Sequence, residues 1–309
     1  MANPAFIFPG QGSQFVGMAR DFYENYDLAK ERFEEANHIL GFDLARLCFE
    51  GPEKELARTD YTQPAIFVHS CIVNELLLQA GYSPIMAAGH SLGEYSALAA
   101  TGVFSFEQGL KLVKLRGRLM HGAGAVIKGT MAAIIGLDYQ VVHNICQAAS
   151  HKALVDLANF NSPQQIVISG TIEGVQMAMA MAKEKGAKRA IQLNVSGAFH
   201  SPLMKPILND FVQELNRIKF SNPQVPVYTN VTGQATLDAE EIKLFLEKQL
   251  LSPVLWTETI RHMTMFGAET FVEVGPGRVL CGLLRKIDRQ IKVTAVGTVR
   301  EFEQMMESI

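Results

Sequence analysis

The sequence has little cysteine, no excess of positive charge and no long hydrophobic run. Among 309 residues, Cys48, Cys71, Cys146 and Cys281 lie far apart without a C-x-x-C pair, which argues against a disulfide framework or a thiolate metal site. Lys and Arg total 28 against 31 Asp and Glu, so a net charge of -3 gives no basic field for nucleic acid. Every apolar run is shorter than the ~18 residues of a membrane helix, and we see no signal peptide. We therefore expect a soluble, cytoplasmic protein that binds neither nucleic acid nor membranes.

Several cofactor motifs are also missing. The sequence contains no H-E-x-x-H, no G-x-x-x-x-G-K-[ST] and no complete G-x-G-x-x-G. The sequence therefore lacks the usual motifs of metal-dependent hydrolysis, Walker-type nucleotide binding and nicotinamide chemistry. We expect neither a metal nor a cofactor.

The composition, with 48% hydrophobic and 19% charged residues, provides enough apolar side chains to form a buried core. Short apolar runs at 5–8, 85–88, 225–231 and 269–274 predict strands that alternate with helical stretches, one of which begins near Pro64. This alternation predicts an α/β fold with a mostly parallel sheet covered on both faces.

A second unit is predicted between residues 126 and 195. The glycine-rich segment 121–129 resembles a flexible crossing, and strands and helices then follow in the order β-α-β-β-α-β, with a turn at 159–164. This order is typical of a ferredoxin-like unit. We therefore predict an inserted small subdomain at 126–195 and a discontinuous large subdomain at 1–125 and 196–309.

The clearest chemical signal is Gly89-His90-Ser91-Leu92-Gly93, between a short apolar strand and a helix. This pattern is the G-x-S-x-G nucleophile elbow, and the strand-to-helix position is the one in which the pattern indicates a serine hydroxyl exposed at a tight turn. The plain alternative is an ordinary strand-to-helix connection. The flanking strand and helix favour Ser91 as a nucleophile.

A serine nucleophile needs a base within hydrogen-bonding reach. His200 is the best candidate because it lies in an irregular segment bounded by Gly197 and Pro202. Helical or surface-like stretches hold His38, His69, His143, His151 and His262. Asp138 and Asp156 fit better as a helix cap and a solvent-facing strand residue than as the acid of a triad. A backbone or amide carbonyl could hold His200 instead.

Arg116 lies on the apolar side of a predicted helix, in register with Leu112 and Leu119. A buried cation without a partner is costly, so Arg116 should meet an anion. The anion could be a protein carboxylate, or a substrate carboxylate gripped by two parallel hydrogen bonds.

Taken together, seven ordered motifs resemble the malonyl-CoA:acyl carrier protein transacylase family along nearly the whole chain. They are FPGQGSQ from Phe8, TQPA from Thr62, GHSLGEYSAL from Gly89, LRGRLM around Arg116, NSPQQIVISG from Asn161, GAFHSPLM from Gly197 and EVGPGRVL from Glu273. The resemblance implies an α/β-hydrolase-like large subdomain with an inserted ferredoxin-like small subdomain.

The resemblance also implies roles for individual residues. Ser91 would be the acylated nucleophile and His200 its general base, while the N-H groups of Gln11 and Leu92 would form the oxyanion hole. Arg116 would bind the malonyl carboxylate. Three further residues take implied roles: the main-chain carbonyl of Gln249 would orient the histidine, Gln63 would line the pocket, and Phe199 would favour malonyl over methylmalonyl units.

The function implied is transfer of malonyl from malonyl-CoA to the phosphopantetheine thiol of acyl carrier protein, by ping-pong kinetics through malonyl-serine, for fatty acid biosynthesis. Malonyl loading for polyketide synthesis is an alternative within the family. A serine esterase or thioesterase would use the same elbow with water as acceptor, and a non-catalytic carrier-binding subunit would bind carrier without being acylated. We expect a monomer.

Overall fold

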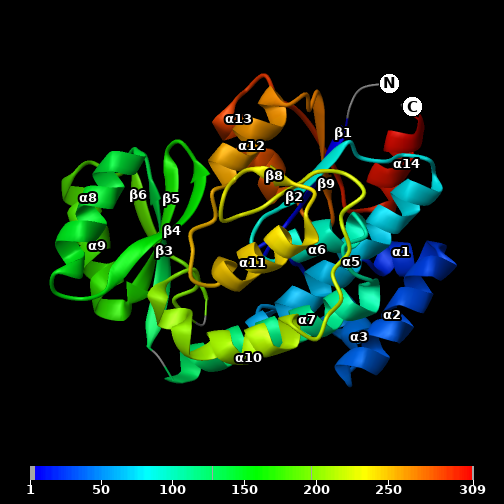
Figure 1. Ribbon diagram of the computed structural model, residues 1–309, viewed down its shortest axis with the longest axis horizontal. Helices are drawn as coiled ribbons and strands as arrows, with labels where there is room; N and C mark the ends of the chain where they lie inside the picture. The colour runs from blue at the N-terminus through cyan, green and yellow to red at the C-terminus, as the bar shows by residue number, and fades with distance from the viewer. Residues whose placement is uncertain (1–3, 127, 196, 308–309) are drawn as a thin grey trace.

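The computed structural model describes residues 4–126, 128–195 and 197–307, which form mixed α/β structure around two separate sheets (Figure 1). In the larger sheet, of order β10-β9-β1-β2-β7-β8, all neighbours are parallel except the antiparallel pair β7 and β8. The strands are β1 (Pro4–Phe8), β2 (Met86–Gly89), β7 (Val227–Tyr228), β8 (Ala235–Thr236), β9 (Thr270–Val274) and β10 (Lys292–Val296). The prediction of a mostly parallel sheet is confirmed.

Helices cover both faces of this sheet (Figure 1). The apolar run of β1 is buried on both sides, because Phe6 and Phe8 join one core cluster while Ala5 and Ile7 join another. The helices of this part are α1 (Arg20–Asn25), α2 (Asp27–Leu40), α3 (Leu44–Glu50), α4 (Glu53–Leu56), α5 (Thr59–Gln79), α6 (Gly93–Ala100), α7 (Phe106–Val126), α10 (Lys205–Leu215), α11 (Ala239–Gln249), α12 (Trp256–Met265), α13 (Val279–Ile287), α14 (Val299–Glu307) and the 3-10 turn η1 (Pro202–Met204).

The smaller sheet is antiparallel, with strand order β4-β5-β3-β6, as expected for a ferredoxin-like unit. Its elements are β3 (Gly129–Ile135), α8 (Tyr139–Ser150), β4 (Val155–Ser162), β5 (Gln165–Thr171), α9 (Ile172–Glu184) and β6 (Arg189–Gln192). Along β3, Ala132 and Ile134 pack with α8 and α9, whereas Met131 and Ala133 join the core of the large unit. The exact subdomain limits stay a prediction, and residue 196 lies outside the described residues.

Strand β4 joins the two units. The predicted turn at 159–164 is wrong in its first part, because β4 continues through Ser162. The extra length is held by pairing: Phe160 N donates to Val254 O at 2.9 Å, and Val254 N donates to Ala158 O at 2.9 Å. The end of β4 is therefore fixed against the large unit, next to the predicted nucleophile.

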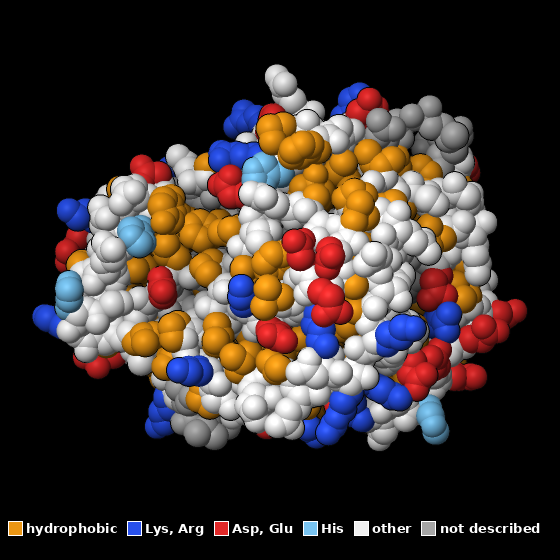
Figure 2. Space-filling view, viewed as in Figure 1, with side chains coloured by type: hydrophobic (Ala, Val, Ile, Leu, Met, Phe, Trp, Pro, Cys, Tyr) orange, Lys and Arg blue, Asp and Glu red, His pale blue; other side chains and the backbone are white. Residues whose placement is uncertain are grey.

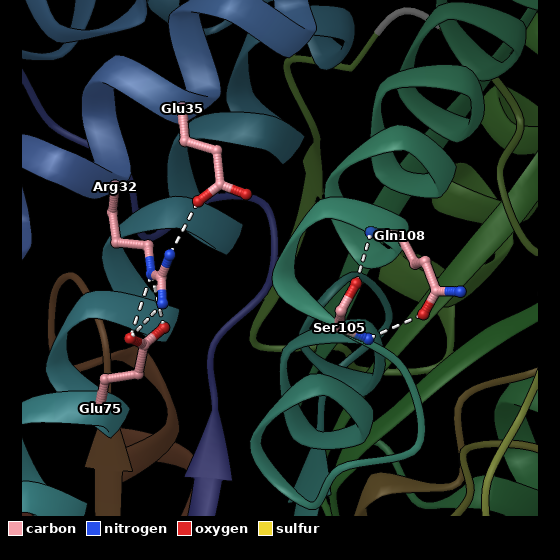
Figure 3. Close-up of polar contacts among 5 residues, drawn as sticks. All are labelled: Arg32, Glu35, Glu75, Ser105 and Gln108. Atoms are coloured by element: carbon pink, nitrogen blue, oxygen red, sulfur yellow. Dashed lines mark hydrogen bonds and ion pairs between the residues drawn. The ribbon is translucent and has the colours of Figure 1, made fainter.

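Arg116 lies near the middle of helix α7. Its start is a capping box, in which Gln108 N donates to Ser105 Oγ at 3.2 Å and Ser105 N donates to Gln108 Oε1 at 3.0 Å (Figure 3). The predicted flexible crossing at 121–129 is wrong up to Val126, since α7 continues to that residue. This end of α7 lies against Gly197, where an added Cβ would be 3.4 Å from Gly124 Cα, an ordinary contact distance.

Helix α5 begins at Thr59 rather than near Pro64, so the predicted start is five residues late. The sequence signal misleads because proline is typical of a first helical turn, whereas here Pro64 lies in the second turn of a helix that already buries Thr62 and Gln63. Farther along, Glu75 of α5 forms an ion pair with Arg32 of α2 at 2.8 Å, and Arg32 also meets Glu35 (Figure 3).

Acidic and basic side chains are interspersed over the face drawn in Figure 2, without a field of one sign. Among the described residues, no helix combines the length and the apolar character needed to cross a lipid bilayer.

Candidate active site

Ser91 lies at the turn between β2 and α6, with a left-handed φ of 52°. The flanking glycines are required by close approach: a Cβ at Gly89 would lie 1.9 Å from Gly93 O, and one at Gly93 would lie 2.0 Å from Phe8 O. A non-glycine residue in the left-handed region is strained and is held by its surroundings. The expected nucleophile elbow is therefore present in its geometry.

His200 faces Ser91, with its Nε2 2.8 Å from Ser91 Oγ. On the other side of the ring, Nδ1 lies 2.9 Å from Gln249 O and 3.1 Å from Ser252 O. Both carbonyls only accept hydrogen bonds, so Nδ1 carries the proton and Nε2 keeps a free lone pair toward the hydroxyl. The histidine is thus oriented by backbone carbonyls, the arrangement the sequence left open.

The environment also keeps this imidazole neutral. Burial, followed by the nearby Arg116 guanidinium, lowers the pKa of His200 from 6.5 to about 3. Its side chain is only 4% exposed. The lone pair on Nε2 is therefore available over a wide range of acidity.

Arg116 projects from α7 toward the same hydroxyl and is 1% exposed. One guanidinium nitrogen, Nη1, donates to Gln63 Oε1 at 2.8 Å, and the other, Nη2, donates to Ser91 Oγ at 3.1 Å and to Gln249 Oε1 at 3.1 Å. These acceptors are neutral, and within the described ranges Arg116 forms no ion pair with a carboxylate. A direct ion pair is therefore absent among the described residues, although the buried Glu94 carboxyl lies close enough to interact electrostatically with the guanidinium.

Two of the remaining expected residues, Gln63 and Gln249, are thus brought to the guanidinium by their side chains. Gln63 also approaches Met120 Sδ, 3.3 Å from its Nε2. The helix α11 ends at Gln249, so its terminal carbonyl can accept from His200 as well as from Ser252 N, which lies 3.4 Å away. Each glutamine therefore supports the cation, and Gln249 supports the histidine as well.

Gln11 and Leu92 flank the elbow from two sides. Gln11 follows Gly10, where a Cβ would lie 2.3 Å from His90 O, so this loop packs directly on the turn. The main-chain N-H groups of Gln11 and Leu92 have no hydrogen-bond partner within the described part of the chain. Both are free to meet an oxyanion, and that role stays a prediction.

Phe199, next to His200, is buried in the large core cluster. A Cβ at Gly197 would lie 3.1 Å from its ring. The side chain therefore packs against its own loop, and its effect on acyl-group choice stays a prediction.

Three polar residues that hold the elbow were not found from the sequence. Asn230 Oδ1 accepts from Ser91 N at 2.7 Å and its Nδ2 donates to Gly89 O at 2.6 Å. Asn161 Oδ1 lies 2.7 Å from His90 Nε2, and Glu94 is fully buried behind the serine. Glu94 and Asn161 fall within the quoted motifs, but only long-range contacts reveal what any of the three supports.

Comparison with known proteins places the chain in a family. Residues 5–303 match the acyl transferase domain family. A malonyl CoA-acyl carrier protein transacylase of Bacillus subtilis (strain 168) is 43% identical over 310 residues, covering 100% of this chain and 98% of that protein.

Solved structures are equally similar. An acyl carrier protein S-malonyltransferase from Vibrio cholerae has a TM-score of 0.94 at 42% identity, covering 98% of this chain and 100% of that one. A malonyl-transacylase in complex with a type II PKS acyl-carrier protein has a TM-score of 0.96 at 41% identity, covering 100% of both chains. The chain therefore belongs to the acyl transferase family, among the malonyl CoA-acyl carrier protein transacylases.

Proposed function

We propose that the protein transfers a malonyl group from malonyl-CoA to the phosphopantetheine thiol of an acyl carrier protein through a malonyl-serine intermediate. The observation that carries this proposal is the meeting of three groups at one hydroxyl: Ser91 Oγ lies 2.8 Å from His200 Nε2 and 3.1 Å from Arg116 Nη2. A nucleophile, a base and a cation for a free carboxylate are what malonyl transfer requires.

In the first half-reaction, Ser91 Oγ forms a bond to the thioester carbonyl carbon while its proton moves to His200 Nε2. The N-H groups of Gln11 and Leu92 donate to the negative oxygen of the tetrahedral intermediate. The carbon-sulfur bond then breaks, and His200 returns the proton to the departing CoA thiolate. The result is malonyl-serine, free CoA and a neutral imidazole.

The second half-reaction runs the same steps with the carrier thiol as nucleophile. His200 takes the thiol proton, sulfur attacks the ester carbonyl, and the proton goes to Ser91 Oγ as the ester bond breaks. Ping-pong kinetics follow, because CoA leaves before the carrier reacts.

Arg116 supplies selectivity in this scheme. A malonyl carboxylate would replace neutral acceptors with an anion, and charge-assisted hydrogen bonds are stronger than neutral ones. Acetyl-CoA offers no such group. Phe199 would restrict space near the α-carbon, so that malonyl is preferred over methylmalonyl.

The test is acylation of the serine. Brief exposure to malonyl-CoA should add one malonyl group to the wild-type protein and none to Ser91→Ala, as measured by intact mass spectrometry. A persistent adduct on Ser91→Ala would assign the nucleophile to another residue. Addition of phosphopantetheinylated carrier should then remove the label from the enzyme.

Two rival activities give different results in the same experiment. A thioesterase would release free malonate without carrier, and a non-catalytic carrier-binding subunit would never be labelled. Malonyl loading for polyketide synthesis remains a second candidate, since one similar structure is a complex with a type II PKS acyl-carrier protein. Fatty acid biosynthesis, a monomeric state, a cytoplasmic location and the absence of a cofactor remain predictions.

A further inference from the structure

A buried carboxyl group lies directly behind the nucleophile and has no part in the steps above. Glu94, in the first turn of α6, is 0% exposed. Its Oε2 accepts from Gln249 Nε2 at 2.6 Å and from Asn230 N at 3.3 Å. Its other oxygen, Oε1, has no hydrogen-bond partner among the residues that the structure describes.

The Gln249 side chain connects this carboxyl to the cation. Its Nε2 donates to Glu94 Oε2 and, at 3.0 Å, to Ser91 O, while its Oε1 accepts from Arg116 Nη2 at 3.1 Å. An amide has one donating end and one accepting end. A flipped amide would face two acceptors with its oxygen and the guanidinium with its NH2 group, so the two acceptors fix its orientation.

We propose that Glu94 is a positioning residue for substrate selection: it fixes the Gln249 amide, whose oxygen holds the Arg116 guanidinium beside Ser91. The inference rests on the proposed role of Arg116 as the group that binds the malonyl carboxylate. Glu94 touches no reacting atom and acts through Gln249.

The task assigned to Glu94 is that of a hydrogen-bond acceptor, and the attraction of its ionised form for Arg116 is a separate effect. Burial raises the pKa of Glu94 to about 7, so the carboxyl is divided between two protonation states near neutrality. Because Oε2 already accepts two N-H groups, the proton of the neutral form goes to Oε1, and Oε2 remains an acceptor in both states. A glutamine can offer the same acceptor without charge.

The test compares kcat/KM for malonyl-CoA with kcat/KM for acetyl-CoA, using full-length enzyme and phosphopantetheinylated carrier. Glu94→Met keeps the side-chain length but removes the acceptor, and we expect the malonyl-to-acetyl ratio to fall at least tenfold. Glu94→Gln should keep the ratio within about threefold of wild type. The ratio is unaffected by the fraction of folded enzyme, which a purely structural role would change for both substrates alike.

Glu273 provides a matched control. It is also fully buried, but its oxygens accept from the main-chain N-H groups of Leu280 and Cys281 at the start of α13. Glu273→Met should therefore leave the ratio unchanged even if it lowers the yield. Should Glu94→Met not fold, Glu94→Asp draws the acceptor back by one methylene and should also lower the ratio.

Each result decides the matter. An unchanged ratio in Glu94→Met, or in Glu94→Asp as its substitute, would overturn the inference, as would a fall in Glu94→Gln as large as that in Glu94→Met. A wild-type enzyme that transfers acetyl as readily as malonyl would refute the proposed role of Arg116, and the inference would fall with it. That result is seen in the wild type alone, so the two failures are distinguishable.

Discussion

The neutral imidazole of His200 leads to a quantitative prediction about acidity. A general base with an ordinary histidine pKa of 6.5 would be only about 3% neutral at pH 5. Burial and the Arg116 guanidinium lower the pKa of His200 to about 3, which leaves about 99% of it neutral at that pH. The two cases differ about 30-fold in competent base at pH 5.

We therefore expect kcat/KM for malonylation of Ser91 to fall less than about twofold between pH 7.5 and pH 5. The assay is rapid-quench labelling with radioactive malonyl-CoA at subsaturating concentration, which reports the free enzyme. A midpoint near pH 6.5 in the wild type would refute the reasoning.

Two controls separate titration from other effects. The depressed pKa of His200 means that its contribution to stability is present above pH 6.5 and is lost as the pH falls toward about 3. Enzyme held at pH 5 is therefore returned to pH 7.5 and must regain full activity. Arg116→Met removes the second cause of the pKa shift, so its acid limb should move to higher pH.

Three further predictions concern neighbouring residues. Arg116→Ala would remove the two charge-assisted hydrogen bonds that we propose for the malonyl carboxylate, together about 3 kcal/mol, so malonyl transfer should fall about 100-fold while acetyl transfer changes little; equal losses would contradict the proposed role. Gly93→Ala forces a Cβ to within 2.0 Å of Phe8 O and should lower the free energy of unfolding by about 1–3 kcal/mol or more in chemical denaturation. The control is Gly122→Ala, whose added Cβ has no atom within 4 Å and which should raise the free energy of unfolding by up to about 1 kcal/mol. Because the pKa of Glu94 is raised from 4.5 to about 7, its contribution to stability is present below pH 4.5 and is lost as the pH rises through 7. The free energy of unfolding of Glu94→Gln minus that of wild type should therefore increase over this range. A flat difference would contradict the shift.

The features that could be predicted from the sequence are those set by local pattern. A strand, a tight turn and a helix follow one another along the chain, so the G-x-S-x-G segment predicted the turn at Ser91 without knowledge of the rest. Helical periodicity likewise predicted that Arg116 is buried, and the structure confirms it. The β-α-β-β-α-β order correctly predicted the ferredoxin-like sheet.

The features that were missed depend on contacts between distant segments. Asn230 reaches Ser91 across 139 positions of sequence, and no periodicity marks an asparagine in a loop as support for an elbow. Glu94 has the pattern of an ordinary acidic residue in a first helical turn, and only its burial reveals another task. The glycines of 121–126 were misread because propensity favours a break, whereas in the structure α7 continues to Val126 and Gly124 lies against Gly197.

The two carbonyls that hold His200 also bear on which acceptor could take an acyl group from Ser91. Gln249 O and Ser252 O hold the ring by dipoles, and no carboxylate among the described residues contacts it, so an imidazolium gains less stabilisation than it would beside an anion. Ser91 Oγ is also a weak acid, but it is held 2.8 Å from the base, whereas a mobile second acceptor reacts more readily if it gives up its proton easily. A thiol has a pKa of about 8.5, against about 15.7 for water. On the proposed mechanism, the two carbonyls that orient the ring would therefore favour transfer to a carrier thiol over hydrolysis.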